Sequence, residues 1–310
     1  MNEYDRVYHE DSMIVRRPPL VWPGGHRAAF SVVVCAEYYE LQPPDDAFVP
    51  PNVPGGFGRA PYPDVRAFSQ REYGNRVGVF RVMEALGKQQ IRATAAADAV
   101  IAARYPFLIE QFQKRNWEIA GHCYSLTRVI SNRMPEEQER NYIRTSLEAV
   151  EKASGTRPNG WHGPEYGESE RTPALLAEFG IKYVLDWSND EQPYLMNTPS
   201  GTIASIPMAL ELDDVITHYH RRIGLARWRQ AVAEALDQLL ADGDSGGRQL
   251  VLALHPWLIG HPHRIGYLED VLADAASRSD LWITTTGEIA DFYLNQPPSI
   301  SQAKLDRGTV

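Results

Sequence analysis

Strand-like and helix-like segments alternate along most of this 310-residue chain. Short apolar runs rich in β-branched residues predict buried strands, and longer segments with apolar residues three and four apart predict amphipathic helices. The alternation repeats about seven times, which implies a parallel sheet covered by helices. The number of repeats favours a closed barrel over an open sheet. The sequence therefore predicts an α/β barrel.

The predicted elements follow one another with few interruptions. Strands are expected at Ala28–Val34 and within residues 91–99, 117–122, 158–164, 181–187, 204–212, 249–256 and 281–286. Helices are expected at residues 74–90, 99–116, 135–155, 172–180, 226–243, 264–277 and 287–294. The longest of these helices has Pro135 near its first turn and Gly155 at its end, as helix signals require.

A single domain is expected because no interior linker interrupts this pattern. Residues 1–27 are polar and rich in Pro and predict an N-terminal arm. Residues 28–295 then form the barrel, and residues 296–310 form a C-terminal tail. Residues 41–70 contain many Pro and Gly without a regular period. Such an insertion is either a functional lid or interface loop, or a disordered surface loop.

Charge and composition exclude several classes of partner. The net charge of −9 argues against non-specific binding to nucleic acid or anionic lipid, which requires clustered Lys and Arg. No segment has the apolar length of a membrane span, and the first residues lack the apolar region of a secretory signal. Only Cys35 and Cys123 are present, which fits a reducing compartment. A cytoplasmic protein with a small-molecule substrate is expected.

Acids and imidazoles follow the apolar runs where the strands are expected to end. They are Glu37, His122, His162, Asp186 and His255. A lone histidine at a strand end is usually structural, but the strand ends of a parallel barrel meet at one face, where active sites lie. Glu37 is either a salt-bridged acid or a base, and His255 is either a core histidine or a proton donor to a leaving nitrogen.

Other histidines and cysteines give weaker signals. His218 and His220 are expected in a solvated loop, and the pair His261 and His263 is separated by a Pro that breaks helical geometry. Cys35 could act as a nucleophile only if a neighbouring base lowered its pKa; otherwise it is a small apolar filler.

Several segments together resemble the polysaccharide deacetylase (NodB-homology) family. They include RPPLVWPGGHRAAFSVVV, WEIAGHCYSLTR, RPNGWHGPEYGES and WITTTGEIADFY. The segments YGNRVG, SNDEQPY and LHPWLIG are most similar to the branch that contains the metal-independent allantoinase and cyclic imide hydrolases. The resemblance implies a distorted (β/α) barrel of seven or eight units, a hydrolase of non-peptide C–N bonds, and a homo-oligomer.

The metal-using members of this family carry Asp-x-Asp after the first strand and His-x-x-x-His after the third. Matched to these motifs, Cys35 stands at the base position and Glu37 at the metal carboxylate. His122 is the first histidine, and Leu126 replaces the second. Two of the four roles are vacant, so the resemblance implies chemistry that requires no cofactor. The alternative is one divalent ion, most readily zinc, held by Glu37, His122 and His255.

The resemblance and the strand-end residues together predict the opening of a small cyclic amide, imide or ureide. Glu37 would hold or deprotonate water, and His122 would order Glu37 or the tetrahedral oxyanion. His255 would protonate the leaving nitrogen, and Arg76 would polarise the carbonyl. Two other functions stay open: a metal-dependent N-deacetylase of an acetylated amino sugar or polysaccharide, and a non-catalytic relative that binds a ligand. Further candidates for substrate binding are His162, Tyr124, Asp186 and Trp257.

Overall fold

The computed structural model describes residues 8–9, 12–45 and 63–297. Their strands form one sheet in the order β6-β7-β5-β4-β3-β2-β1-β8, with β9 paired to the first residues of β1. All pairs are parallel except the antiparallel pair of β6 and β7. The strands are β1 (Ala28–Ala36), β2 (Thr94–Ala97), β3 (Glu118–Gly121), β4 (Gly160–Trp161), β5 (Tyr183–Val184), β6 (Tyr194–Thr198), β7 (Gly201–Ser205), β8 (Arg248–Leu254) and β9 (Leu281–Ile283).

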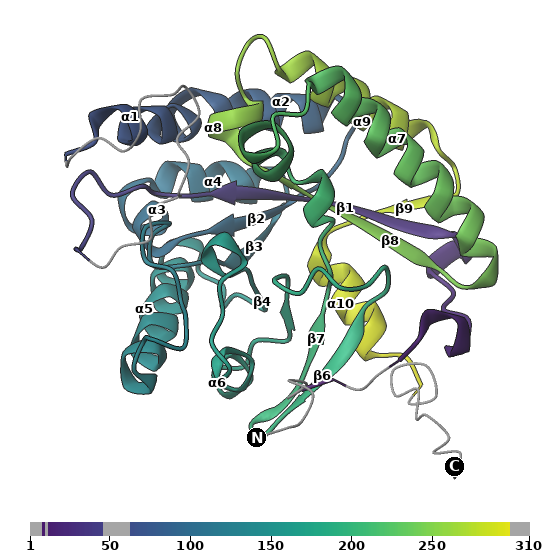
Figure 1. Cartoon of the computed structure of the whole chain (residues 1–310), viewed down its shortest axis with the longest axis horizontal. Coiled ribbons are helices and arrows are strands. Elements are labelled where there is room, and N and C mark those ends of the chain that lie inside the picture. Colours follow the sequence, from purple (N-terminus) through teal and green to yellow (C-terminus); the bar gives the residue numbers. More distant parts are fainter. Residues whose placement is uncertain (1–7, 10–11, 46–62, 298–310) are drawn as a thin grey trace.

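Helices cover the outside of this curved sheet (Figure 1). They are α1 (Val65–Tyr73), α2 (Val79–Lys88), α3 (Ala99–Arg104), α4 (Pro106–Lys114), α5 (Glu136–Ser154), α6 (Thr172–Glu178), α7 (Leu225–Asp242), α8 (Pro256–Ile259), α9 (Ile265–Ser277) and α10 (Thr286–Leu294). None of the helices in the described ranges combines the length and the apolar character needed to cross a membrane.

The ring of strands is closed by irregular chain rather than by a regular strand pair. Between β7 and β8, the backbone N–H of Ala209 donates to the carbonyl of Val251 at 2.9 Å. The N–H of Gln249 donates to the carbonyl of Glu191 at 2.8 Å. These isolated hydrogen bonds join the two ends of the sheet, so the molecule is the distorted α/β barrel that the sequence predicts.

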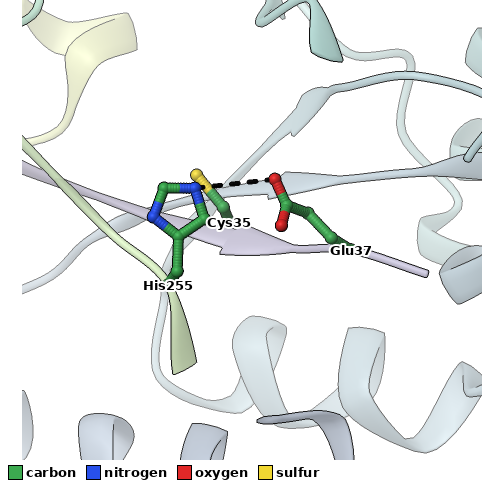
Figure 2. A group of neighbouring side chains, drawn as sticks. All are labelled: Cys35, Glu37 and His255. Carbon is green, nitrogen blue, oxygen red and sulfur yellow. Dashed lines mark ion pairs between the residues drawn. The ribbon is translucent and has the colours of Figure 1, made fainter. Parts of the chain in front are cut away.

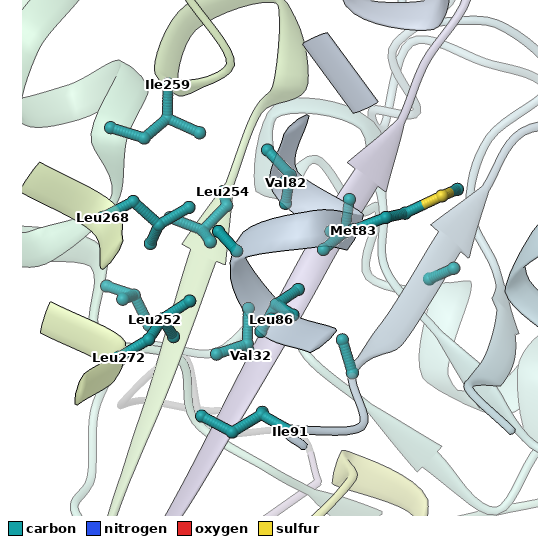
Figure 3. Close-up of a cluster of buried hydrophobic side chains, with 14 of the residues drawn as sticks. Val32, Val82, Met83, Leu86, Ile91, Leu252, Leu254, Ile259, Leu268 and Leu272 are labelled. Carbon is teal, nitrogen blue, oxygen red and sulfur yellow. The ribbon is translucent and has the colours of Figure 1, made fainter. Parts of the chain in front are cut away.

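Two hydrophobic layers fix the direction of the β1 side chains. Val32 and Val34 belong to the outer layer, which includes residues of the helices α2 and α9. Figure 3 shows Val32 in this layer near Leu86, Leu252 and Leu272. Val33 and Cys35 belong instead to the layer inside the barrel. Because side chains alternate along a strand, Glu37 follows Cys35 on the inner side. The first strand thereby directs both residues toward the barrel interior at its C-terminal end.

The predicted N-terminal arm contributes to the core at its last residues. Trp22 is buried, contacts Trp282 and Phe292, and donates its indole N–H to the carbonyl of Arg248 at 2.8 Å. Leu20 is buried in the same inner layer. Leu20 and Trp22 therefore close the end of the barrel where β1 begins, whereas the sequence predicts an arm outside the core up to residue 27.

The structure corrects three further predictions about elements. The expected strand at residues 204–212 is shorter, because β7 ends at Ser205 and Leu210–Leu212 forms a 3₁₀ turn. The segment with His218 and His220 is a π-helical turn, η6 (Val215–His220), rather than a loop. The last part of the predicted insertion is helix α1, which is capped by Asp64. Residues 46–62 of that insertion and most of the predicted tail lie outside the described residues.

Candidate active site

Glu37, His122 and His255 meet at the C-terminal end of the barrel. Glu37 follows β1, His122 follows β3, and His255 follows β8, which pairs along its own full length with β1. Oε1 of Glu37 lies 3.3 Å from Nε2 of His122 and 3.6 Å from Nε2 of His255. Residues that are more than 80 positions apart in the chain therefore form one buried cluster, as the strand-end pattern predicts.

Glu37 is a buried carboxylate with one free oxygen. Oε2 of Glu37 is buried and has no hydrogen-bond partner in the part of the chain that the structure describes. Burial by itself would raise the pKa of Glu37, but the charge of His255 and the hydrogen bond and charge of His122 outweigh it and lower the pKa to about 2. Glu37 is therefore ionised at neutral pH, with an unused acceptor atom directed at whatever enters the site.

His255 is held in one orientation by Asp214. Nδ1 of His255 lies 2.7 Å from Oδ1 of Asp214, and the backbone N–H of His255 donates to the same carboxylate. Nε2 is thereby directed toward Glu37. Burial would lower the pKa of His255, but Cys35 and the acids Glu37, Asp213 and Asp214 raise the pKa well above its usual range. His255 is thus a protonated imidazole, the form that can donate a proton.

His122 lies behind Glu37 and is fully buried. Its Nδ1 lies within hydrogen-bond distance of the carbonyl of His162, and its ring stacks on that of His162 with centroids 4.8 Å apart. Nδ1 of His162 in turn lies 2.8 Å from Asp186, which also accepts from the backbone N–H of Gly163 at 2.7 Å. Asp186 therefore orients His162 and does not itself line the cavity.

A small cavity opens beside this cluster. It is lined by Glu37, Arg71, Leu126, His162, Glu165, Tyr166, Asp213, Val215, Ile216, His255 and Trp257. The guanidinium of Arg71 stacks on the Trp257 ring at 3.6 Å from its centroid, and Nε of Arg71 is buried without a hydrogen-bond partner among the described residues. A buried guanidinium with an unused donor costs free energy unless a ligand satisfies it. Arg71 is therefore positioned to receive an oxygen of a substrate.

The motif Gly74-Asn75-Arg76-Val77-Gly78 explains how Arg71 reaches Trp257. These residues form the π-helical turn η3 (Gly74–Gly78), which lies directly against the chain that carries Trp257. A Cβ at Gly74 would lie 2.5 Å from the backbone nitrogen of Trp257, and one at Gly78 would lie 2.1 Å from the carbonyl oxygen of Pro256. Only glycine allows this approach, so the two glycines hold Arg71 and Trp257 side by side.

One wall of the cavity has an unusual backbone. Glu165 and Tyr166 both adopt positive φ angles, of 54° and 58°. Two consecutive non-glycine residues in this region are strained, and such strain gathers at functional sites. The phenol of Tyr166 donates to Asp213 at 2.8 Å, and burial raises the pKa of Glu165, whose side chain borders the cavity.

Two predicted substrate contacts are not where the sequence places them. The Arg76 side chain is 70% exposed and pairs with Glu72 at 3.9 Å, so it points away from the cavity. Tyr124 packs against Tyr142 and Arg128 and does not line the cavity. Of the two arginines in this segment, the structure places Arg71 and not the predicted Arg76 at the cavity. Arg71 lies one helical turn earlier and borders the cavity, because Arg76 is on the side of the helix that faces solvent.

The residues that sequence reasoning missed are Arg71, Glu165, Asp213 and Asp214. Asp213 and Asp214 follow the irregular chain after β7, and both lie beside His255. Two consecutive acids after a strand-like run are a usable signal for a site at a barrel face. Arg71 and Glu165 carry no such signal, because their direction depends on η3 and on the left-handed backbone.

The ligand set of the metal-using family members is incomplete here. Leu126, at the position of their second histidine, lines the cavity with an apolar side chain. Cys35, at the position of their catalytic base, is buried, and burial raises the pKa of its thiol to about 12. A neutral thiol is a poor base, so the residues do not fit the metal-assisted mechanism of those relatives.

The sequence and the fold are both similar to those of known polysaccharide deacetylases and an allantoinase. The sequence model of the family described as polysaccharide deacetylase matches residues 72–184. The crystal structure of the PuuE allantoinase superimposes with a TM-score of 0.84 at 26% identity, covering 94% of this chain and 99% of the allantoinase. A probable polysaccharide deacetylase from Pseudomonas aeruginosa PAO1 gives a TM-score of 0.81 at 25% identity, covering 91% of this chain and 95% of that one.

Residues 72–184 of the chain match a polysaccharide deacetylase domain, and the fold is that of the two crystal structures. A relative in Schizosaccharomyces pombe, also named for this family, is 23% identical over 302 residues, covering 89% of this chain and 93% of the relative. The family and the deacetylase fold predicted from the sequence are confirmed. The prediction of an enzyme that hydrolyses non-peptide C–N bonds is confirmed at the level of the family. The substrate, the metal requirement, the cellular location and the oligomeric state stay predictions.

Proposed function

We propose that this deacetylase domain opens a small cyclic amide, imide or ureide by attack of water on a ring carbonyl. The observation that carries the proposal is the placement of Glu37 between His122 and His255, with a free carboxylate oxygen beside a small cavity. The close fit to an allantoinase along nearly its whole length supports a ring substrate.

The groups around the cavity suit the two proton transfers of such a hydrolysis. Water bound to Oε2 of Glu37 would attack the carbonyl carbon and pass a proton to the carboxylate as the C–O bond forms. His255 would give its proton to the ring nitrogen as the C–N bond breaks. The proton on Glu37 then returns to His255 across the 3.6 Å between Oε1 and Nε2. The net reaction adds one water and yields one open-chain product that has a carboxylic acid at one end and, at the other, an amine from a cyclic amide, an amide from an imide or a urea from a ureide.

The low pKa of Glu37 limits which substrates can react. A carboxylate with a pKa of about 2 is a weak base, so the carbonyl must be strongly electrophilic. Ring imides and ureides meet this requirement better than unstrained acyclic amides. Arg71 would make the carbonyl more electrophilic by donating a hydrogen bond to its oxygen, where negative charge develops in the transition state. The weak base and the buried arginine are thus consistent with one substrate class.

No metal ion is needed in this proposal. Leu126 removes a ligand that metal-using relatives have, and the charge that a metal would stabilise is assigned to Arg71 and His255. The rival function is metal-dependent N-deacetylation, for which the match to the peptidoglycan deacetylase of Helicobacter pylori gives support over half of the chain. That relative is 26% identical over 163 residues, 52% of this chain and 53% of its own length.

The test is a substrate panel after exhaustive chelation of the purified protein. Allantoin, hydantoin, succinimide and a dihydropyrimidine are offered as ring substrates, and N-acetylglucosamine oligomers as acetylated substrates. Opening of at least one ring at an unchanged rate after chelation is the expected result. Acetate release that appears only on adding a divalent ion would replace the proposal with the rival function. Binding of rings without turnover would identify a non-catalytic relative.

A further inference from the structure

A thiol, a carboxylate and an imidazole gather within the site. Cys35 and Glu37 lie two residues apart on the inner side of β1, and His255 follows β8 at the register position beside Cys35. One candidate ligand atom from each residue, the Cys35 Sγ, a Glu37 carboxylate oxygen and a His255 ring nitrogen, lies within 4.8 Å of the other two. Figure 2 shows the three side chains directed toward one another. All three are buried.

The surroundings prepare these atoms to act as ligands. Asp214 accepts from Nδ1 of His255 and directs Nε2 into the cluster, where it can bind a metal ion once its proton has left, as second-shell carboxylates do for metal-bound histidines. Oε2 of Glu37 has no donor within the described ranges. Ligands around zinc lie roughly 3.5 Å from one another, since each is about 2.0–2.3 Å from the ion. The three groups therefore need to close by only about 1 Å.

This set differs from the metal site of the metal-using relatives. Cys35 stands where those proteins have their catalytic base, so a metal here would take a ligand from a position that is not part of their ligand set. A thiolate with an imidazole and a carboxylate is a combination that zinc and cobalt accept, and that magnesium and calcium do not favour. The donor chemistry thus selects a borderline-soft ion.

We propose that Cys35, Glu37 and His255 bind one zinc ion, and that this ion inhibits the hydrolase. On binding, the Cys35 thiol and Nε2 of the protonated His255 each lose a proton to solvent, and bonds from zinc to the sulfur, the carboxylate and Nε2 replace the pair of Glu37 with His255. Zinc then holds the two groups that would accept and donate protons in the reaction. Only the inhibition rests on the proposed function, because binding itself can be measured without turnover.

Cobalt titration of the metal-free protein tests the site directly. A cobalt–thiolate bond gives a near-ultraviolet charge-transfer absorption, which is expected to saturate at one equivalent in the wild-type protein. The band should be absent in Cys35→Ser, where zinc affinity measured by calorimetry should fall by about 100-fold. Cys123→Ser is the matched control, because Cys123 is equally buried but belongs to no candidate cluster in the described ranges, and it should keep the band.

A band that survives in Cys35→Ser, or a wild-type protein that takes up no cobalt or zinc, would overturn the zinc site. His255→Gln gives a second variant in case Cys35→Ser fails to fold, and it should weaken zinc binding while leaving the unfolding transition cooperative. Near-ultraviolet circular dichroism of each metal-free variant verifies its fold.

The inhibition is tested on a ring substrate that the metal-free protein opens. One equivalent of zinc should stop the wild-type enzyme and Cys123→Ser, and chelation should restore both. Zinc that binds and accelerates ring opening would contradict the inhibition while supporting the site. If no ring substrate is opened, the proposed function fails, and the cobalt titration still decides on the site.

Discussion

Two glutamates at opposite ends of the barrel show that a polar group with all its hydrogen bonds made has a different role from one with an atom left without a partner. Glu118 begins β3 and accepts hydrogen bonds from Tyr183 at 2.8 Å, from Thr94 at 2.9 Å and from the backbone N–H of Gly287 at 2.7 Å. Glu37, beyond the end of β1, faces two imidazoles and keeps one oxygen without a partner in the described structure. The half-buried Glu118, with all its bonds made, holds the fold together, whereas the buried Glu37, with a free oxygen, is prepared for a ligand.

The pKa values of the two acids are shifted in opposite directions. Burial raises the pKa of Glu118 despite its hydrogen bonds, because Tyr183, Gly287 and Thr94 are uncharged donors. The pKa of Glu37 falls to about 2, because His255 and His122 overcome the effect of burial. At the end of the barrel with the candidate site, Glu37 is therefore a carboxylate paired with His255, and both groups can contact a substrate.

The largest expected effect is that of Glu37→Gln on catalysis. The amide cannot accept a proton from water, so kcat should fall by about 1,000-fold, within the range for loss of a general base. The free energy of unfolding should also fall at neutral pH, since a carboxylate with a lowered folded pKa stabilises the fold and its loss leaves His255 without this partner. Steady-state hydrolysis and urea denaturation measure the two quantities. Loss of stability without loss of kcat would show that Glu37, like Glu118, has a structural role and no catalytic one.

Arg71→Lys should have the next largest effect. A lysine keeps the charge but loses the planar stack on Trp257 and the fork of donors, so kcat/KM should fall by about 100-fold. Arg76→Lys is the matched control, because that side chain is mostly exposed in the same segment, and it should retain wild-type kinetics. Equal losses in both variants, or a loss only in Arg76→Lys, would contradict the placement of Arg71 in the cavity.

Glu118→Gln should affect stability rather than catalysis. The amide nitrogen would replace one acceptor among three donors, which costs on the order of 1–3 kcal/mol of unfolding free energy. Thermal or urea unfolding measures the cost, and kcat should stay within about twofold of wild type. Glu84→Gln, on an exposed helix position, controls for the loss of a charge. A large drop in kcat at full stability would give Glu118 a catalytic role.

The smallest effect is expected at Glu40, a rim carboxylate that pairs with Arg128 at 2.9 Å. Burial would raise the pKa of Glu40, but hydrogen bonds from Arg128, Thr127 and Ser125 lower it below its ordinary value of 4.5. A lowered folded pKa stabilises the protein above about pH 4.5 and loses this effect as the pH falls through the folded value. Glu40→Gln should therefore flatten the fall in unfolding free energy between neutral and acid pH, whereas an unchanged slope would show that the pair contributes nothing.

Much of the fold follows from local pattern, and the failures have a common cause. The continuous β-branched run before Cys35 could only be a buried parallel strand, and the helices that flank it show clear periodicity. The hairpin of β6 and β7 was missed because its residues are partly exposed and of mixed polarity, which hides the strand signal. Hydrophobic pattern reports burial, so it identifies elements that are buried on a whole face and overlooks those at an edge.

The site residues also fall into those that the local sequence pattern predicts and those that it does not. Glu37, His122 and His255 could be predicted because strand ends converge in any parallel barrel. Arg71 could not, because its position depends on two glycines that pack against Pro256 and Trp257, a contact between segments about 180 residues apart. Asp214 orients His255 from an irregular segment, and the direction of its side chain has no local signature. Long-range packing therefore decides which polar residues reach the cavity.

The most direct measurement is a crystal structure of Glu37→Gln with an intact ring substrate bound. The account predicts that the ring lies in the cavity beside Trp257, with a carbonyl oxygen within hydrogen-bond distance of Arg71 and the adjacent ring nitrogen facing Nε2 of His255. A ring bound outside this cavity, or one whose carbonyl points away from Arg71 and residue 37, would contradict the account.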